Sequence, residues 1–211
     1  MKKRLEVIYE KLLKEYGPQG WWPISSKYHP SDYSFPKDKN EQFEIIIGAL
    51  LTQNTQWTSV EKSLNNLKKL DALEPRSLLK LDDEKLKNAI RPSGYFNHKS
   101  ERLKLLAEWF LKDEGIPTRE DLLKLNGIGP ETADSILLYA YKVPSFVVDT
   151  YTKRILMGLE LIDTSFGYNE IKKLFEGTLK PDYKIFQEFH ALLVEHAKEL
   201  KNGKENFLLN I

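Results

Sequence analysis

Apolar residues recur at the three- and four-residue spacing of an α-helix along almost the whole chain, and one run alone has the character of a strand, residues 143–148. This pattern predicts an all-α fold of about ten helices. The helices are expected at residues 3–16, 43–51, 58–70, 75–80 and 83–90, in a segment ending near 112, on both sides of residues 127–129, from 149–150 onward, and at 168–178 and 182–201. Two capping-box spacings, Thr58 with Glu61 and Thr118 with Asp121, predict helix starts.

Composition narrows the chemistry that the chain can carry. Its 211 residues, 41% of them hydrophobic, can fill one good-sized core or two small ones. Because there is no cysteine, disulfides, thiol nucleophiles, Cys-ligated zinc and ordinary iron–sulfur clusters are excluded, and four histidines argue against a His-rich metal site. Carboxylate, hydroxyl and amine chemistry remain.

Charge gives no general sign of a partner, since 32 Lys and Arg residues balance 31 Asp and Glu residues for a net charge of +1. A nucleic-acid site must therefore be local. The basic start, Met1 to Arg4, precedes charged residues instead of an apolar signal core, and charges interrupt every hydrophobic run. We expect a cytoplasmic protein without a membrane partner.

Two glycines, Gly127 and Gly129, stand one residue apart immediately before a helix predicted to begin at Pro130. Such glycines let the backbone turn tightly and approach a ligand, while the free N–H groups of a helix start favour an anion such as a DNA phosphate. Backbone contacts of this kind position a duplex without reading its sequence. A plain tight turn between two helices explains the same residues equally well.

Four segments in a fixed order extend this pattern and cover most of residues 40–155: Phe43-Glu44 with Leu50 to Thr55, Ser93 to Lys99, the glycine hairpin, and Val147 to Thr150 with Arg154 beyond. Together they resemble the helix-hairpin-helix DNA glycosylase superfamily typified by endonuclease III. Within it, three segments are most similar to bacterial 3-methyladenine DNA glycosylases that lack an iron–sulfur cluster: Trp21 to Pro23, Leu51 to Thr55 and Arg91 to Gly94.

The resemblance implies two helical domains around a DNA-binding cleft. Residues 37–144 would form a helical-barrel domain that contains the hairpin, and residues 1–36 would combine with 145–211 in the second domain. The implied partner is damaged double-stranded DNA, and the implied state is a monomer without an iron–sulfur cluster.

The resemblance also implies that Asp149 is the catalytic carboxylate. Breaking an N-glycosidic bond builds positive charge on the sugar, which an ionised carboxylate stabilises while it orients water. An N3-methylated adenine is cationic and leaves as a neutral base, so it needs no strong general acid. The alternative role for Asp149 is the N-cap of the following helix, a position that Thr150 could also fill.

Bifunctional members of the superfamily carry a Schiff-base lysine eighteen residues before the aspartate, and Glu131 stands there in this chain. Because a carboxylate forms no imine, we expect a monofunctional enzyme without lysine-dependent strand cleavage.

Three aromatic residues, Trp21, Trp22 and Phe43, are the candidates for stacking on a flipped base. A cationic purine between their faces would gain about 0.5 to 2 kcal/mol of cation–π attraction. Core packing is the alternative for each of them. The resemblance adds Lys198 near this pocket.

The turn at residues 52–55 resembles the wedge loop of the family, whose amide side chain fills the hole left by the flipped base. Asn54 and then Gln53 match that position, although a solvated helix end would use the same residues. The predicted phosphate contacts are Gly127, Gly129, Glu131, Thr132, Lys99, Lys153 and Arg154. The family also binds a monovalent cation through hairpin carbonyls, here those of Leu125, Gly127 and Ile128.

Two other functions remain open at this point. The same carboxylate could excise uracil, mismatched thymine or oxidised bases, although a neutral leaving base would require polar groups on its edge. The chain could also be a non-catalytic DNA-binding module that keeps the hairpin, and the presence of Asp149 argues against that reading.

Overall fold

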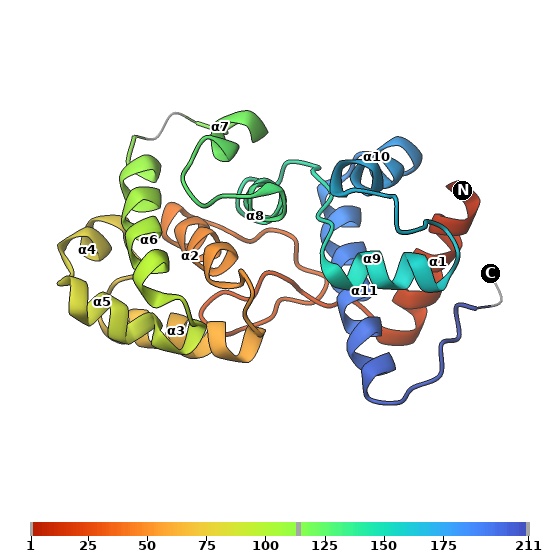
Figure 1. Ribbon diagram of the computed structural model, residues 1–211, viewed down its shortest axis with the longest axis horizontal. Helices are drawn as coiled ribbons and strands as arrows, with labels where there is room; N and C mark the ends of the chain where they lie inside the picture. The colour runs from red at the N-terminus through yellow and green to blue at the C-terminus, as the bar shows by residue number, and fades with distance from the viewer. Residues whose placement is uncertain (1, 113–114, 210–211) are drawn as a thin grey trace. The chain divides into compact units, whose positions relative to one another are not determined.

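A computed structural model describes residues 2–112 and 115–209, and these residues contain no strand, only an isolated bridge between Ile24 and Lys27 (Figure 1). The predicted all-α fold is confirmed, and the run 143–148 is extended without joining a sheet. The helices are α1 (Lys2–Tyr16), α2 (Lys39–Leu51), α3 (Trp57–Lys69), α4 (Pro75–Lys80), α5 (Asp83–Ile90), η1 (Arg91–Ser93), α6 (Phe96–Phe110), α7 (Arg119–Leu123), α8 (Pro130–Ser135), η2 (Ile136–Ala140), α9 (Thr150–Gly158), α10 (Tyr168–Thr178) and α11 (Tyr183–Lys201).

The chain divides into two compact units. Unit 1 contains residues 1–21, 29–33 and 142–211, and unit 2 contains residues 22–28 and 34–141. Residues 22–28 and 34–36, predicted to lie in the domain of the termini, thus belong to unit 2, and residues 142–144, predicted to lie in the helical-barrel domain, belong to unit 1. The Trp22 side chain explains the position of residues 22–28, because it packs on Gly48, Trp57 and Tyr139 of unit 2.

Unit 2 is built around α2, which contacts α3, α6, α8 and η2. Every residue from Phe43 to Leu51 is buried, as the nearly continuous apolar run predicts. The helix begins four residues earlier than expected, because the Asp38 carboxylate accepts hydrogen bonds from the N–H groups of Asn40 and Glu41.

The two capping-box predictions have different outcomes. Thr118 caps α7 by accepting a hydrogen bond from the Asp121 N–H at 3.1 Å, as predicted. The Thr58 prediction is wrong, since α3 begins at Trp57 and Gln56 occupies the N-cap without a side-chain hydrogen bond. Trp57 packs edge-on against Trp22 at 5.3 Å between ring centroids, so a tertiary contact fixes this helix start.

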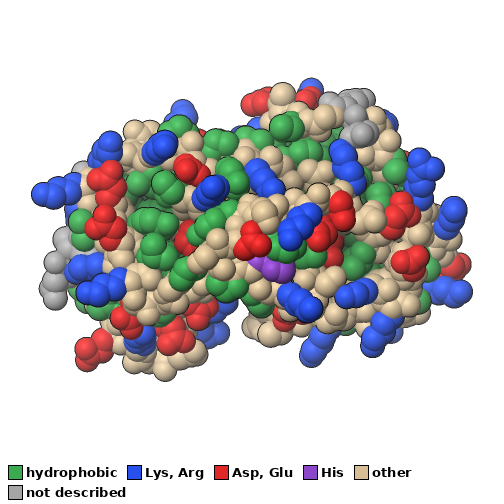
Figure 2. All heavy atoms as spheres, turned by 180° about the vertical axis from the view of Figure 1, so that it is seen from behind, with side chains coloured by type: hydrophobic (Ala, Val, Ile, Leu, Met, Phe, Trp, Pro, Cys, Tyr) green, Lys and Arg blue, Asp and Glu red, His purple; other side chains and the backbone are tan. Residues whose placement is uncertain are grey.

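Unit 1 joins both ends of the chain, because α1 contacts α10 and α11, and α9 packs on α11 (Figure 1). A stacked pair of rings, Phe146 and Phe175, lies in its core with 3.7 Å between centroids. Basic and acidic side chains are interspersed on the face that Figure 2 shows, in keeping with the balanced composition. None of the helices in the described residues has the length and apolar character needed to cross a membrane.

Candidate functional site

The extended segment before Asp149 is anchored to α10. The Phe146 N–H donates to Glu176 Oε1 at 2.9 Å, and the Lys172 ammonium donates to the same carboxylate oxygen and to Ser145 Oγ, both at 2.6 Å. Residues 145–148 are buried. The backbone that delivers Asp149 to the start of α9 is therefore held by both hydrogen bonds and ring packing.

Asp149 uses its two carboxylate oxygens for different contacts. Oδ1 accepts the Thr152 N–H at 2.7 Å and so caps α9, while Oδ2 lies 3.6 Å from His190 Nε2 on α11. The helix cap thus uses one carboxylate oxygen and leaves the other for a second contact. Thr150, the alternative cap in the sequence, is instead the first residue of the helix.

The electrostatic surroundings keep this carboxyl group ionised. Burial raises the pKa of Asp149, but the nearby His190 and the hydrogen bond from the Thr152 N–H together hold it below its ordinary value. The side chain remains 14% exposed. An accessible carboxylate that stays charged can stabilise positive charge on a reacting group and orient water.

His190 is the residue of this site that the sequence did not reveal. It lies 41 positions beyond Asp149, on a helix whose apolar stripe gives no reason to single out one histidine. Only the packing of α9 on α11 brings the two residues together.

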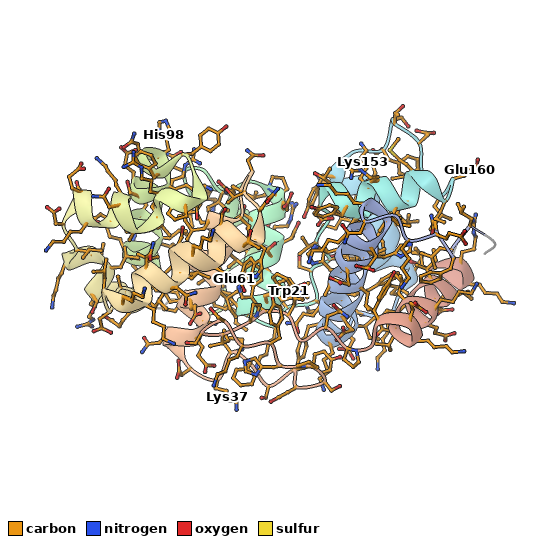
Figure 3. The ribbon with its side chains drawn as sticks, turned by 90° about the horizontal axis from the view of Figure 1, so that it is seen from below. Trp21, Lys37, Glu61, His98, Lys153 and Glu160 are labelled. Atoms are coloured by element: carbon orange, nitrogen blue, oxygen red, sulfur yellow. The ribbon has the colours of Figure 1, made fainter. Side chains whose placement is uncertain are left out.

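Two predicted pocket residues, Trp21 and Lys198, lie close together in unit 1. Figure 3 labels Trp21. The Lys198 ammonium is 6.0 Å from the centre of the Trp21 ring, and it also lies 3.4 Å from Glu195 Oε2. The loop that carries Trp21 is attached to α11 through Glu188, whose carboxylate accepts the Gln19 N–H at 2.6 Å and the Tyr33 hydroxyl at 2.7 Å.

The other two predicted pocket aromatics pack inside unit 2. Phe43 is fully buried, with its ring 5.2 Å from that of Phe110, and Trp22 fills the space over Gly48, where an added Cβ would come within 2.9 Å of the indole. The core alternative therefore describes Phe43 and Trp22, and adjacent tryptophans in sequence belong to different units.

The two wedge candidates, Gln53 and Asn54, also differ in their surroundings. The Gln53 amide donates to Gly127 O and to Thr132 Oγ1, both at 2.9 Å, so this side chain braces the turn against the hairpin. Asn54 is exposed at the tip of the turn, with a left-handed φ of 52°. Of the pair, Asn54 is the one whose side chain faces solvent.

One hairpin glycine is required by geometry and the other leaves open space. Gly127 has a φ of 82°, and a Cβ there would lie 2.1 Å from Arg102 Nε. No atom lies near a Cβ added at Gly129, so a ligand can approach that backbone. Glu131 is exposed in the first turn of α8, while Thr132 is buried against the Gln53 amide.

The predicted phosphate contact of Lys99 requires correction. Lys99 is only 2% exposed, and its ammonium is surrounded by protein oxygens, so it cannot meet a phosphate in this arrangement. Lys153, which Figure 3 labels, donates one hydrogen bond to the Phe166 carbonyl at 2.8 Å and remains half-exposed. Arg154 is exposed on α9 and keeps the predicted availability.

Two of the three hairpin carbonyls predicted to bind a monovalent cation each accept a hydrogen bond. Gly127 O accepts the Gln53 amide and Leu125 O accepts the Ile128 N–H at 3.1 Å. Within the described residues, no group of three or more His, Cys, Asp or Glu side chains could hold a metal ion.

Tyr95 is a further exposed candidate to which the sequence gave no role. It precedes α6, is 69% exposed and has a left-handed φ of 46°. A large aromatic side chain held at this angle on the surface is unusual, and it directly follows the η1 turn and Gly94.

Known proteins match the chain over most of its length. The family model described as HhH-GPD superfamily base excision DNA repair protein matches residues 47–181. The protein named "Putative DNA repair glycosylase MJ1434" of Methanocaldococcus jannaschii is 43% identical over 209 residues, covering 93% of this chain and 88% of its own.

Two solved structures have the same fold. H. pylori 3-methyladenine DNA glycosylase bound to 1,N6-ethenoadenine is 30% identical, with a TM-score of 0.68 and coverage of 94% of this chain and 96% of that one. A non-covalent endonuclease III–DNA complex is 19% identical, with a TM-score of 0.72 and coverage of 92% and 84%.

Proposed function

The chain belongs to the HhH-GPD superfamily of base excision DNA repair proteins and is a DNA glycosylase, and we propose that it is a monofunctional enzyme that removes alkylated purines, 3-methyladenine foremost. The observation that carries this proposal is the Asp149 carboxylate, which is partly exposed, kept ionised by His190 and held at the start of α9.

The proposed reaction needs little besides this carboxylate. As the bond between sugar and base breaks, positive charge develops on the sugar, and the Asp149 Oδ2 edge stabilises it while orienting the attacking water. Oδ1 remains engaged with the Thr152 N–H, which fixes the orientation of the group. A cationic alkylated base departs as a neutral molecule without a proton from the enzyme.

Recognition of such a base is assigned to an aromatic face. Trp21 is partly exposed and lies in the same unit as Asp149, so we propose it as the stacking residue of the pocket. The 30% identity to a 3-methyladenine glycosylase over nearly the whole chain supports this substrate class. Uracil or oxidised bases are the competing substrates.

The absence of strand cleavage is proposed from Glu131, which is exposed where bifunctional relatives carry the imine-forming lysine. Borohydride should therefore trap no covalent adduct between the protein and a duplex containing an abasic site. A trapped band that disappears when a lysine is replaced would contradict this part of the proposal.

Release of free bases from methylated DNA, identified by chromatography, tests the substrate. We expect 3-methyladenine from the wild type and at least a roughly 100-fold slower release by Asp149→Asn. Asparagine keeps an oxygen for the Thr152 N–H, so the variant isolates the charge from the helix cap. Release of uracil alone from a mixed panel, or an Asp149→Asn rate within about threefold of wild type, would refute the assignment.

A further inference from the structure

The Lys99 ammonium is enclosed by four oxygens of unit 2. Its Nζ lies 2.9 Å from Leu51 O, 3.0 Å from Gln53 O, 2.8 Å from Thr55 Oγ1 and 2.8 Å from Ser93 O. An ammonium has three N–H groups, so at least one of them is shared between two oxygens.

These oxygens come from separate parts of the chain. Leu51 O is a terminal carbonyl of α2, Gln53 and Thr55 belong to the turn at residues 52–55, and Ser93 closes η1. The Thr55 hydroxyl adds a direct bond to Ser93 O at 2.7 Å. Lys99 itself lies in the first turn of α6, where its N–H donates to Tyr95 O. One side chain thus ties the turn of Asn54 to the turn of Tyr95.

This arrangement is unfavourable for the free energy of folding. All four oxygens facing Lys99 from α2, the turn and η1 are uncharged, and the charged group that acts on it is Arg102 of its own helix, which repels it. Burying a cation without a carboxylate costs free energy, and a nonpolar side chain of similar length would avoid that cost. The cluster is therefore better explained by the geometry it fixes.

We propose that Lys99 is a positioning residue for damaged-DNA recognition, which locks the Asn54 turn and the Tyr95 turn into one rigid surface. The proposal rests on the proposed function in one respect, that these two exposed turns face the duplex. Lys99 touches no DNA. It acts by holding Asn54 and Tyr95 in a single frame, so that both engage an opened base pair together.

Binding to two duplexes tests the proposal without any excision step. One duplex contains a tetrahydrofuran abasic analogue opposite 2-aminopurine, and the other is undamaged. We expect Lys99→Met to lower the preference for the analogue at least about fivefold and to reduce the 2-aminopurine signal, with binding to the undamaged duplex and its salt dependence unchanged. Lys85→Met, at an exposed lysine of α5, is the matched control.

Three results would overturn the proposal: a preference within twofold of wild type, a wild type that shows no preference, or a salt slope that falls by about one, which would make Lys99 a phosphate contact. If Lys99→Met does not fold, Thr55→Val removes one oxygen of the cluster and its link to Ser93, and should lower the preference about twofold to fivefold. An unchanged Thr55→Val preference would then refute the proposal. Failure to release alkylated bases, with the Lys99 effect intact, would refute the proposed substrate alone.

Discussion

Predicted site residues of unit 1 keep part of their surface open, whereas Phe43 and Lys99 of unit 2 are enclosed and only some of its other candidates, such as Asn54 and Glu131, are exposed. In unit 1, Asp149 and Trp21 keep part of their surface open, and Arg154 is exposed. In unit 2, Phe43 is fully buried and Lys99 nearly so. The difference follows from the partners that the fold supplies. A side chain that neighbouring residues enclose completely belongs to the packed frame of its unit, whatever its chemical type.

The same contrast separates two charged groups. Asp149 lies beside His190, a group able to carry the opposite charge, whereas Lys99 faces only neutral oxygens and is repelled by Arg102. The surroundings of Asp149 therefore favour its charged form, whereas the surroundings of Lys99 disfavour its charged form. The following predictions test whether each residue belongs to the packed frame of its unit or to the site that acts on DNA.

The largest expected effect is on Phe43. Phe43→Ala should lower the free energy of unfolding by about 3 to 5 kcal/mol, because it empties a fully buried position beside Phe110. Trp21→Ala should cost less stability and instead weaken excision of an alkylated base by about 1 to 3 kcal/mol, the scale of base–aromatic stacking. Urea unfolding and single-turnover excision separate the two outcomes.

The comparison fails if both variants behave alike. If Trp21→Ala loses as much stability as Phe43→Ala and keeps its activity per folded molecule, Trp21 is a packing residue of the frame. If Phe43→Ala is stable but excises a different set of bases, Phe43 is a residue of the site.

The hairpin offers a matched pair of glycines. Gly127→Ala should cost about 2 kcal/mol, since it combines a left-handed φ with a clash against Arg102. Gly129→Ala meets no neighbouring atom and should cost less than about 1 kcal/mol. Chemical denaturation measures both. A loss at Gly129 as large as that at Gly127 would show that the space there is not open.

The helices were largely predictable from sequence, because periodic apolar residues and caps are local signals. The short helices α4 and α5 and the long α11 lie where expected. The start of α3 was not predictable, because it depends on a ring contact with Trp22 from a distant loop. Local rules also cannot divide Trp21 from Trp22, which the fold assigns to different units.

Site residues were predictable where a motif marked their position. The prediction failed where the surroundings of a side chain decide its role. The hairpin turn at Gly127 follows from its sequence. His190 could not be found, since its meaning comes from a helix packed beside Asp149. Lys99 and Gln53 matched family positions, but their hydrogen-bond partners are set by three segments that meet only in the folded unit.

A smaller effect is expected when Lys99 loses its proton. Burial, with a contribution from Arg102, lowers its pKa from 10.5 to about 8. Between these values the unfolded chain holds the proton and the folded chain does not, so stability should rise with pH in this window. Wild type should gain about 1 kcal/mol relative to Lys99→Met between pH 7.5 and pH 9 in urea unfolding. Parallel stability curves would mean that Lys99 keeps an ordinary pKa.

The smallest expected effect concerns His190 and the acid limb of excision. His190 lowers the pKa of Asp149, whereas burial raises it, so His190→Ala should raise that pKa. Because the reaction needs the ionised carboxylate, excision falls as pH drops through this pKa, and the limb should move to higher pH in the variant. His98→Ala, at an exposed histidine of α6, is the control and should leave the profile unchanged (Figure 3). His190→Gln, which keeps a polar group but cannot become charged, should shift the limb by less than the alanine variant if part of the effect is a hydrogen bond. Superimposable profiles for wild type and His190→Ala would show that Asp149 is tuned by the helix start alone, and His190 would then belong to the frame.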